Sequence, residues 1–310
     1  MNLIVTSICN KDCSFCFAKD KNIDKGLSIQ EIKSLVEKAS PETHIKILGG
    51  EPTLHKDFPE IMDYLLTIPN PIVLISNFLI YKDSILDAIN KYQEKKKLMF
   101  LLNVSEVTDY QFQTVIKNIK YLAKTPTFSL GYTLDINRKF NDYSKWLDKF
   151  YNEIGEHVNV IRVSVPFPNY RDNDERDFYL YHNYEYTDLI TEFVKWSNKH
   201  DLKTSIDCGL FPCMFRDQES KEFIQKFVNF EMGCKGGAFD IFSTKLISLC
   251  YPGNDIIANL ENHNTIETAF SEIELRKRHK ILTSKNLPKE CKECEFFLKE
   301  CAGPCLGFIK

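Results

Sequence analysis

Three cysteines near the start of the chain have the spacing of a metal-cluster loop. Cys9, Cys13 and Cys16 follow residues 3–6, whose apolar and β-branched side chains predict a strand. A closed structural zinc site needs four ligands, and the next histidine is as far away as His44. Three thiolates on a [4Fe–4S] cluster instead leave one iron open for chemistry. The spacing therefore favours a catalytic iron–sulfur cluster.

Strands and helices alternate over the first two thirds of the chain and must position this loop. Strands are predicted at residues 3–6, 44–48, 72–75, 98–104, 127–134, 158–165 and 203–206, and helices after residue 28 and at 58–66, 83–92, 108–123, 143–154 and 186–199. Ser28 and Glu31 have the spacing of a capping box in front of the first helix. About six βα units indicate a mainly parallel sheet, either a barrel or doubly wound. In a barrel the loop after the first strand lies at the active face.

A second motif, Gly49-Gly50-Glu51-Pro52, ends the second predicted strand. Together with the cysteine loop, in which the aromatic Phe15 precedes the third cysteine, it resembles the two signatures of the radical SAM superfamily. The resemblance covers the barrel half in order and spacing. It implies a partial (β/α)6 TIM-like barrel over residues 1–206, with the backbone and the Glu of the second motif receiving the amino group of S-adenosylmethionine.

The same resemblance implies the chemistry. S-adenosylmethionine chelates the open iron, one electron breaks its C–S bond, and a 5′-deoxyadenosyl radical abstracts hydrogen from the substrate. Further cofactor contacts are implied at the ends of the third, fourth and sixth strands, namely Ser76, Asn77, Asn103, Ser105, Arg162 and Ser164. For each of these residues a purely structural role, such as a turn or a cap, stays open.

The cysteines of residues 207–310 form a second constellation, in a region predicted to be a separate small domain. Eight of the eleven cysteines lie here, which is the ligand count of two further [4Fe–4S] clusters. Their spacing is similar to the SPASM extension of radical SAM enzymes. By that resemblance a first auxiliary cluster is held by Cys213, Cys234, Cys250 and Cys305, and three corners of a second by Cys291, Cys294 and Cys301.

The extension departs from the family pattern in three places. Six residues separate Cys294 from Cys301 where five are usual, Lys245 replaces a glycine, and the late cysteine of the second cluster is absent. Cys208 completes that cluster, or its iron is open, or only one auxiliary cluster exists, as in twitch domains. Zinc at the last four cysteines is the remaining alternative. Cys208 itself is a ligand, a hydrogen-atom donor as in peptide epimerases, or a bystander.

Composition restricts partners and compartment. The net charge is −3 with a pI near 6.2, so nothing indicates bulk attraction to nucleic acid or anionic lipid. No signal sequence is recognised, and the apolar runs are far shorter than the ~20 residues needed to cross a bilayer. We therefore expect a cytoplasmic protein, whose odd number of cysteines, eleven, indicates metal or redox chemistry in place of disulfides.

The resemblance to radical SAM enzymes with a SPASM extension implies an enzyme that modifies a ribosomally made peptide by epimerisation or by thioether or carbon–carbon crosslinking. The expected partners are the peptide and an electron donor such as flavodoxin or ferredoxin. Because the predicted barrel begins at residue 2, a leader-binding domain is expected to be a separate protein or unnecessary. The alternatives are dehydrogenation of a small molecule, with an auxiliary cluster taking the second electron, and a non-catalytic iron–sulfur electron carrier.

Overall fold

The computed structural model describes residues 1–16, 26–96, 98–122, 127–135, 137–166, 184–207, 210–228, 233–234, 239–242, 245–250, 255–285 and 287–306. Cys208 lies outside these residues, so its three alternative roles stay predictions. The chain forms two compact units. Unit 1 consists of Met1–Phe128 and Gly236–Lys277, and unit 2 of Ser129–Lys235 and Arg278–Lys310. The boundary at residue 206 between a barrel and a second domain stays a prediction.

Unit 1 contains alternating strands and helices followed by three short strands. Its strands are β1 (Asn2–Thr6), β2 (Ile45–Gly49), β3 (Ile72–Ser76), β4 (Met99–Asn103), β8 (Asp240–Ile241), β9 (Leu246–Ser248) and β10 (Ile257–Asn259). Its helices are α1 (Ile29–Val36), α2 (Phe58–Leu65), α3 (Asp83–Lys95), α4 (Asp109–Tyr121) and the part of α8 (Ile266–Thr283) that ends at Lys277.

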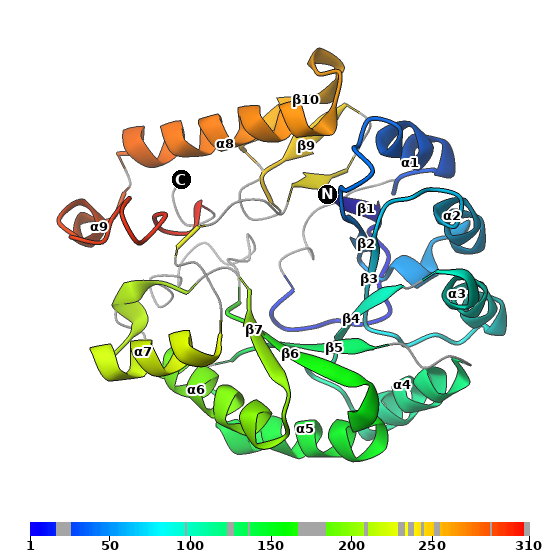
Figure 1. The fold of residues 1–310 in the computed structure, drawn as a ribbon, viewed down its shortest axis with the longest axis horizontal. Helices are drawn as coiled ribbons and strands as arrows, with labels where there is room; N and C mark the ends of the chain where they lie inside the picture. Colours follow the sequence, from blue (N-terminus) through cyan, green and yellow to red (C-terminus); the bar gives the residue numbers. More distant parts are fainter. Residues whose placement is uncertain are drawn as a thin grey trace. The chain divides into compact units, whose positions relative to one another are not determined.

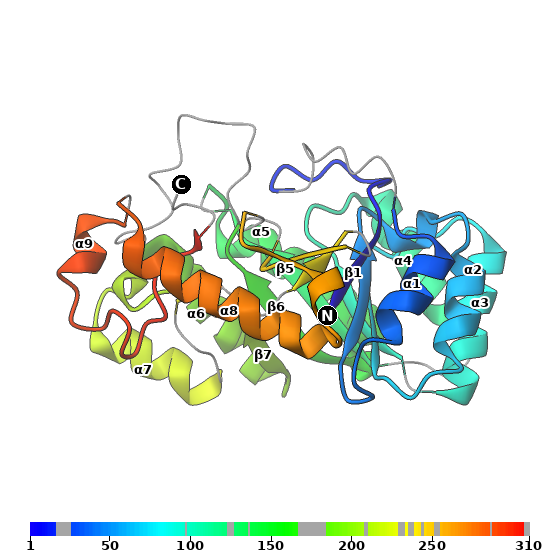
Figure 2. The ribbon, with the colours of Figure 1, turned by 90° about the horizontal axis from the view of Figure 1, so that it is seen from above.

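The strands of unit 1 are ordered β10-β9-β8-β1-β2-β3-β4. Strands β1 to β4 pair in parallel, and β8 adds to the other edge of β1, also in parallel. The pairs β8–β9 and β9–β10 are antiparallel. Helices α1 to α4 lie outside β1 to β4 (Figure 1), and Figure 2 shows them from a second direction. Parallel strands joined by helices end at one edge of the sheet, which is where the predicted motifs lie.

Burial explains why β1 is a central strand. Leu3, Ile4 and Val5 have no exposed surface, so both faces of the strand are covered, as is typical of a parallel sheet between layers. On its outer edge, the Asn2 side chain donates a hydrogen bond of 2.6 Å to the buried Asp240 carboxylate of β8. A strand paired on both edges and covered on both faces holds the loop that follows it firmly in place.

Helix starts in unit 1 follow the local signals in the sequence. The predicted capping box of α1 is confirmed, because the Ser28 side chain accepts from the Glu31 N–H and the Glu31 carboxylate accepts from the Ser28 N–H. Thr108 and Gln111 form a second capping box in front of α4. The seven strands and six helices predicted up to residue 206 are all present, with ends that differ by a few residues.

Unit 2 contains the remaining βα units. Its elements are β5 (Phe128–Thr133), α5 (Phe140–Ile154), β6 (Val158–Ser164), α6 (Tyr184–Lys199), β7 (Lys203–Ile206), α7 (Gln218–Phe227) and α9 (Lys289–Lys292). The strands are ordered β5-β6-β7, and β6 pairs with β7 in parallel from Val160 to Val163. Three aromatic side chains pack on Phe193 of α6, with ring centroids 5.3–5.6 Å away, and form part of the core of this unit.

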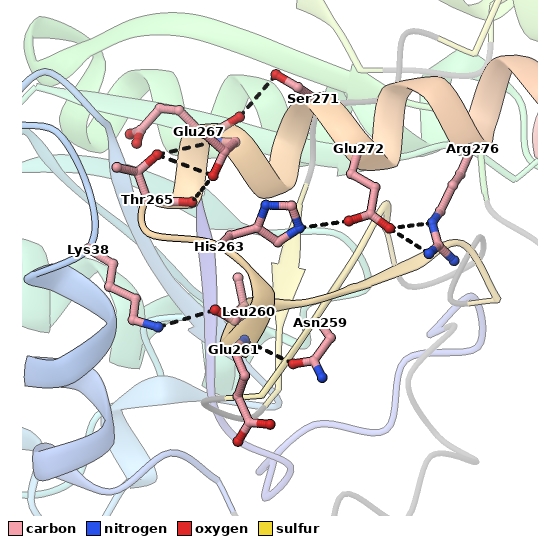
Figure 3. Close-up of polar contacts among 11 residues, drawn as sticks. Lys38, Asn259, Leu260, Glu261, His263, Thr265, Glu267, Ser271, Glu272 and Arg276 are labelled. Atoms are coloured by element: carbon pink, nitrogen blue, oxygen red, sulfur yellow. Dashed lines mark hydrogen bonds and ion pairs between the residues drawn. The ribbon is translucent and has the colours of Figure 1, made fainter.

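Helix α8 is regular structure in a region whose sequence shows little periodicity. Its buried residues Ile266, Ala269 and Ile273 follow helical spacing, but Leu275 and Leu282 are exposed and blur the pattern. A polar cluster in unit 1 fixes the start of the helix (Figure 3). Within the described residues, no helix is both long enough and apolar enough to cross a membrane.

In this cluster, His263 Nε2 lies 2.6 Å from Glu272 Oε2, and the other oxygen of Glu272 accepts from Arg276 at 2.5–2.7 Å (Figure 3). The imidazole hydrogen bond and the guanidinium lower the pKa of Glu272 below its ordinary value. Lys38, just after α1, donates to the Leu260 carbonyl at 3.2 Å, which ties the segment before α8 to the chain that follows the first helix. These contacts anchor a late segment of the chain to the first βα unit.

The turn after β3 is fixed by one buried amide. The Asn118 side chain of α4 is 3% exposed and donates to the carbonyls of Phe78 and Ile80 at 3.0 and 2.9 Å. Phe78 adopts a φ of 58°, in the left-handed region, and its buried ring packs edge-on against Phe100. A non-glycine residue with this φ needs such support from its surroundings.

Replacing this amide tests its role in the fold. In Asn118→Leu the two buried carbonyls lose their donor, so we expect the free energy of unfolding to fall by about 1–3 kcal/mol. Urea unfolding followed by circular dichroism measures the change. Gln113→Leu, at an exposed position of the same helix, is the matched control and should change stability by less than about 0.5 kcal/mol. Equal effects in the two variants would contradict the assigned role.

Candidate active site

Two glycines bring the end of β2 against the segment that follows β1. The Gly50 N–H donates to the Thr6 carbonyl at 2.8 Å, and the Glu51 N–H donates to the Ile8 carbonyl at 2.7 Å. A Cβ on Gly49 would lie 2.2 Å from the Thr6 oxygen, and one on Gly50 would lie 2.3 Å from the Ile8 oxygen. Only glycine fits this approach. The predicted second motif therefore lies directly beside the chain that leads into Cys9.

The Glu51 carboxylate is completely buried and saturated with hydrogen bonds. Its Oε1 accepts from the hydroxyls of Thr53 and Ser76, both at 2.7 Å, and its Oε2 accepts from the Asn77 N–H at 2.8 Å. The Thr53 N–H adds a fourth contact at 3.2 Å. Burial raises the pKa of Glu51, and the four donors oppose this shift. The carboxylate thus fastens the end of β2 to the end of β3.

The cysteine loop is a compact turn with a polar framework. The Cys16 N–H donates to the Cys13 carbonyl at 3.2 Å, and the Lys11 N–H lies 3.4 Å from Cys9 Sγ. Burial raises the pKa of the Cys9 and Cys13 thiols, and the three thiols are close enough to interact electrostatically.

The turn after β3 holds this loop from one side. The Asn77 amide donates to Asn10 Oδ1 at 2.8 Å and lies 3.9 Å from Cys9 Sγ. The Asn10 amide in turn donates to the Leu79 carbonyl at 2.8 Å. Asn77, a predicted contact of the cofactor, lies in that turn, and its side chain is beside Asn10 and Cys9. The predicted cofactor contact itself stays a prediction.

The turn after β4 holds the loop from the other side. Lys11 Nζ donates to the Ser105 carbonyl at 2.6 Å, and the Ser14 N–H donates to Glu106 Oε2 at 3.0 Å. The Ser14 hydroxyl donates to the other oxygen of the same carboxylate. Glu106 has a φ of 52°, which is uncommon for a residue with a side chain. These anchors were not predicted, although Ser105 and Glu106 directly follow a predicted strand end, which is a usable signal.

The other predicted contact residues differ in their exposure and in their partners. In unit 1, Asn103 is exposed at the end of β4, Ser105 and Pro52 are buried, and Phe15 is half-buried. In unit 2, Arg162 pairs with Asp207 at 2.6 Å, and Ser164 Oγ lies 3.1 Å from Thr133 Oγ1. Their roles at a cofactor stay predictions.

The donor set of the loop fits an iron–sulfur cluster. Three thiols within one short turn are soft ligands of the kind that such clusters require, and an amide lies beside the first of them. In the described part of the chain, no three His, Cys, Asp or Glu side chains lie close enough together to hold a single metal ion. In a cluster, each thiolate binds a different iron, so its ligands are spread more widely than those of one ion.

The auxiliary cysteines divide between the two units. Cys250 follows β9 in unit 1, whereas the other described ones lie in unit 2, namely Cys213, Cys234, Cys291, Cys294, Cys301 and Cys305. All ten described cysteines are thiols without a disulfide. The predicted ligand sets of the auxiliary clusters are not decided by this division.

Comparison with protein families gives a match for the part of the chain that carries this site. Residues 3–128 match the model of the Radical SAM superfamily. This range includes the cysteine loop, the Gly49–Pro52 motif and the anchoring turns after β3 and β4. The resemblance inferred from the two motifs is thereby confirmed.

Curated relatives are similar over part of their length. The GTP 3′,8-cyclase of Psychromonas ingrahamii is 34% identical over 225 residues, which are 65% of this chain and 62% of that protein. The probable GTP 3′,8-cyclase of Pyrococcus abyssi is 25% identical over 210 residues, which are 63% of this chain and 65% of that protein. The chain thus spans less than two thirds of the length of these relatives.

Solved structures match over nearly the whole chain. Streptococcus suis SuiB bound to S-adenosylmethionine has a TM-score of 0.69 at 15% identity, covering 99% of this chain and 72% of SuiB. SuiB bound to the precursor peptide SuiA has a TM-score of 0.67 at 16% identity, covering 99% and 71%. At this identity the match shows the fold, and the predicted partial barrel with a cysteine-rich C-terminal region is confirmed.

Replacing Glu51 by Gln tests the buried carboxylate. One oxygen becomes an NH2 group that faces either the Thr53 N–H or the Asn77 N–H, so two donors meet in a buried place. We expect the free energy of unfolding to fall by about 1–3 kcal/mol. Glu60→Gln makes the same chemical change at an exposed position of α2 and should leave stability within about 0.5 kcal/mol. A Glu51→Gln protein as stable as this control would refute the fastening role.

The Ser14–Glu106 contact should determine how tightly the loop keeps its iron. In Glu106→Ala the loop loses two hydrogen bonds, so we expect a chelator to remove loop-bound iron about fivefold faster, equivalent to about 1 kcal/mol. The rate is followed by absorbance of the anaerobically reconstituted protein. Ser14→Ala combined with Glu106→Ala should add little to Glu106→Ala alone, because the Ser14 hydroxyl has then already lost its acceptor.

The control for this experiment is Glu42→Ala, which removes an exposed carboxylate of the same unit. Its rate of iron loss should equal that of the unmodified protein. Fully additive effects of the two substitutions at the contact would mean that Ser14 and Glu106 act separately.

Proposed function

Since residues 3–128 of this chain match the model of the Radical SAM superfamily, we propose that it cleaves S-adenosylmethionine reductively and modifies a ribosomally made peptide, by epimerisation or by crosslinking. One observation carries the choice of substrate. The fold that covers 99% of the chain, including the cysteine-rich end, is that of SuiB, which has been crystallised with the precursor peptide SuiA.

The proposed chemistry comes from the bound groups: the cluster and S-adenosylmethionine supply a 5′-deoxyadenosyl radical, which removes a hydrogen atom from the substrate. The protein contributes position. Cys9, Cys13 and Cys16 would hold the cluster, and the turns after β3 and β4 fix their loop through the contacts described above. The backbone of the Gly49–Pro52 motif would receive the amino group of the cofactor, as the resemblance to the superfamily implies.

The contact between Glu51 and the amino group of the cofactor, which the resemblance implies, stays a prediction, and in this proposal the same carboxylate also positions the cofactor site. All of its hydrogen bonds described here come from the protein, and the carboxylate has no exposed surface. Asn77, by contrast, lies beside both the loop and the end of β3, where a polar side chain can meet the carboxylate of the cofactor. An electron donor such as flavodoxin or ferredoxin, and a separate leader-binding protein, complete the proposed set of partners.

A second candidate function is favoured by the sequence relatives. The curated proteins named above are GTP 3′,8-cyclases, and the one from Psychromonas ingrahamii shares 34% identity over its matched region. A nucleotide or another small molecule is therefore the competing substrate class. In this second function the same residues would bind S-adenosylmethionine, and only the substrate from which the radical takes hydrogen would differ.

The two candidates are separated by following the abstracted hydrogen. The protein is reconstituted anaerobically, reduced, and given S-adenosylmethionine with either GTP deuterated at C3′ or synthetic peptides encoded by short reading frames beside the gene. We expect 5′-deoxyadenosine to form faster with one peptide, which loses two hydrogen atoms on crosslinking or gains one deuterium in heavy water on epimerisation. Mass spectrometry measures each product.

Cys13→Ala is the control, because loss of a loop thiol should abolish 5′-deoxyadenosine with every substrate. Transfer of deuterium from GTP to 5′-deoxyadenosine, with all peptides unchanged, would overturn the peptide proposal in favour of a nucleotide substrate. A reduced, iron-loaded protein that releases no 5′-deoxyadenosine under any condition would contradict both.

A further inference from the structure

Helices cover one face of the strands in unit 2. The Tyr132 ring of β5 packs on Phe193 of α6, with ring centroids 5.6 Å apart. On the neighbouring strand β6, Ile161 and Val163 have no exposed surface. Helices α5 and α6 lie along this side of the strands (Figure 1). Because successive side chains of a strand point to opposite faces, the residues between these belong to the other face of the sheet.

That other face is polar and only partly buried. The pairing of β6 with β7 puts Arg162 beside Ser205. Ser164 follows on the same side of β6, and its hydroxyl oxygen lies 3.1 Å from that of Thr133 in β5. All four side chains are half-buried. A sheet face of this kind can accept a polar ligand, and in parallel α/β folds ligands bind at the carboxyl ends of the strands.

An ion pair lies at the carboxyl end of this face. Arg162 Nη2 donates to Asp207 Oδ2 at 2.6 Å, and each of the two side chains is 31% exposed. The Asp207 N–H donates to the Val163 carbonyl at 2.9 Å, so the residue directly after β7 is fixed to β6. A guanidinium has five N–H donors. Among the residues that the structure describes, Asp207 is the one hydrogen-bond partner of the Arg162 side chain, so further donors can meet a ligand.

The charge of this face favours one kind of ligand. The Asp207 carboxylate balances the Arg162 guanidinium, and the neighbouring hydroxyl side chains are uncharged. Lys203 lies at the opposite end of β7, as its first residue. A triphosphate is bound by several cationic groups together, and the described residues at the carboxyl end of this face carry no surplus positive charge. Donors with a balanced charge suit uncharged acceptors, such as the carbonyl oxygens of a peptide backbone.

We propose that Arg162 donates to a backbone carbonyl of the peptide substrate, and that Asp207 is a positioning residue that aims the guanidinium and cancels its charge. The inference rests on the proposed function, because it assigns a contact to the peptide class of substrate. It gives Arg162 a role at the substrate in place of the cofactor contact that the resemblance implies.

The test measures binding without turnover. The full-length protein is reconstituted anaerobically, given S-adenosylmethionine but no reductant, and titrated by calorimetry with each synthetic peptide described above or with GTP. We expect Asp207→Asn to weaken peptide binding about tenfold, because the guanidinium loses the carboxylate that aims it. The same variant should bind GTP several-fold more tightly, because the charge of Arg162 is then unbalanced. A general loss of structure would not shift the two affinities in opposite directions.

Asp188→Asn is the matched control. It breaks another Arg–Asp pair of unit 2, in which Arg216 Nη2 lies 2.7 Å from Asp188 Oδ2 between half-exposed side chains, and it should change neither affinity. Asp207→Glu keeps the carboxylate and should recover most of the peptide affinity. Circular dichroism identifies a variant that has not folded, and Asp207→Ser then replaces Asp207→Asn with the same expectation.

The outcomes separate this inference from the proposed function. An unchanged peptide affinity in both Asp207→Asn and Arg162→Leu would overturn the inference, and modification of the peptide would still stand. An unchanged GTP affinity in Asp207→Asn would contradict the role of the balanced charge. An unmodified protein that binds GTP but none of the peptides would overturn the inference, and deuterium transfer from GTP would then decide against the proposed function as well.

Discussion

One buried carboxylate holds together the strand ends on which the candidate site is built. Glu51 has no contact with water, and four donors from the protein satisfy its two oxygens. Such a group is costly to bury and is tolerated only when its partners are held in place. Two of those partners, Ser76 and Asn77, end the neighbouring strand. The carboxylate therefore fixes the end of β2 and the end of β3 relative to each other.

The cysteine loop depends on this arrangement. Because the Asn77 backbone is bound to Glu51, its side chain is aimed at Asn10 and Cys9. The two glycines of the motif allow the backbone of residues 6–8 to approach closely, so the loop leaves β1 in one direction. Parallel pairing puts all these ends at one edge of the sheet. A loop with no regular structure of its own thus takes its shape from three neighbouring strands.

The sequence predicts those parts of the molecule whose signals are local. Strands, helices and the Ser28 capping box follow from periodicity and end signals, and the cysteine loop and the Gly49–Pro52 motif follow from spacing. The contacts of Asn10, Glu106 and Asn118 could not be predicted in this way, because each joins residues distant in the chain and leaves no periodic trace. Strand β8 was missed for a similar reason, since two residues are too short to show a pattern.

In the cysteine-rich region, too, contacts between residues distant in the chain could not be predicted from the sequence. Spacing there indicates how many ligands exist and not which thiols share a site. That depends on how the chain returns on itself, for instance where Gly233 packs against residues 302 and 303. Helix α8 was overlooked because its exposed Leu275 and Leu282 disguise a regular buried face.

The turn after β4 has a consequence for how two binding events influence each other. Ser105 and Glu106 hold the cysteine loop through Lys11 and Ser14, while Asn103 and Ser105 are predicted to contact the cofactor. Both roles thus fall on residues 103–106, so binding at one site that shifts these residues also affects the other site. Linkage then requires the effect to be mutual: a loaded loop favours nucleoside binding as much as bound nucleoside favours the loaded loop.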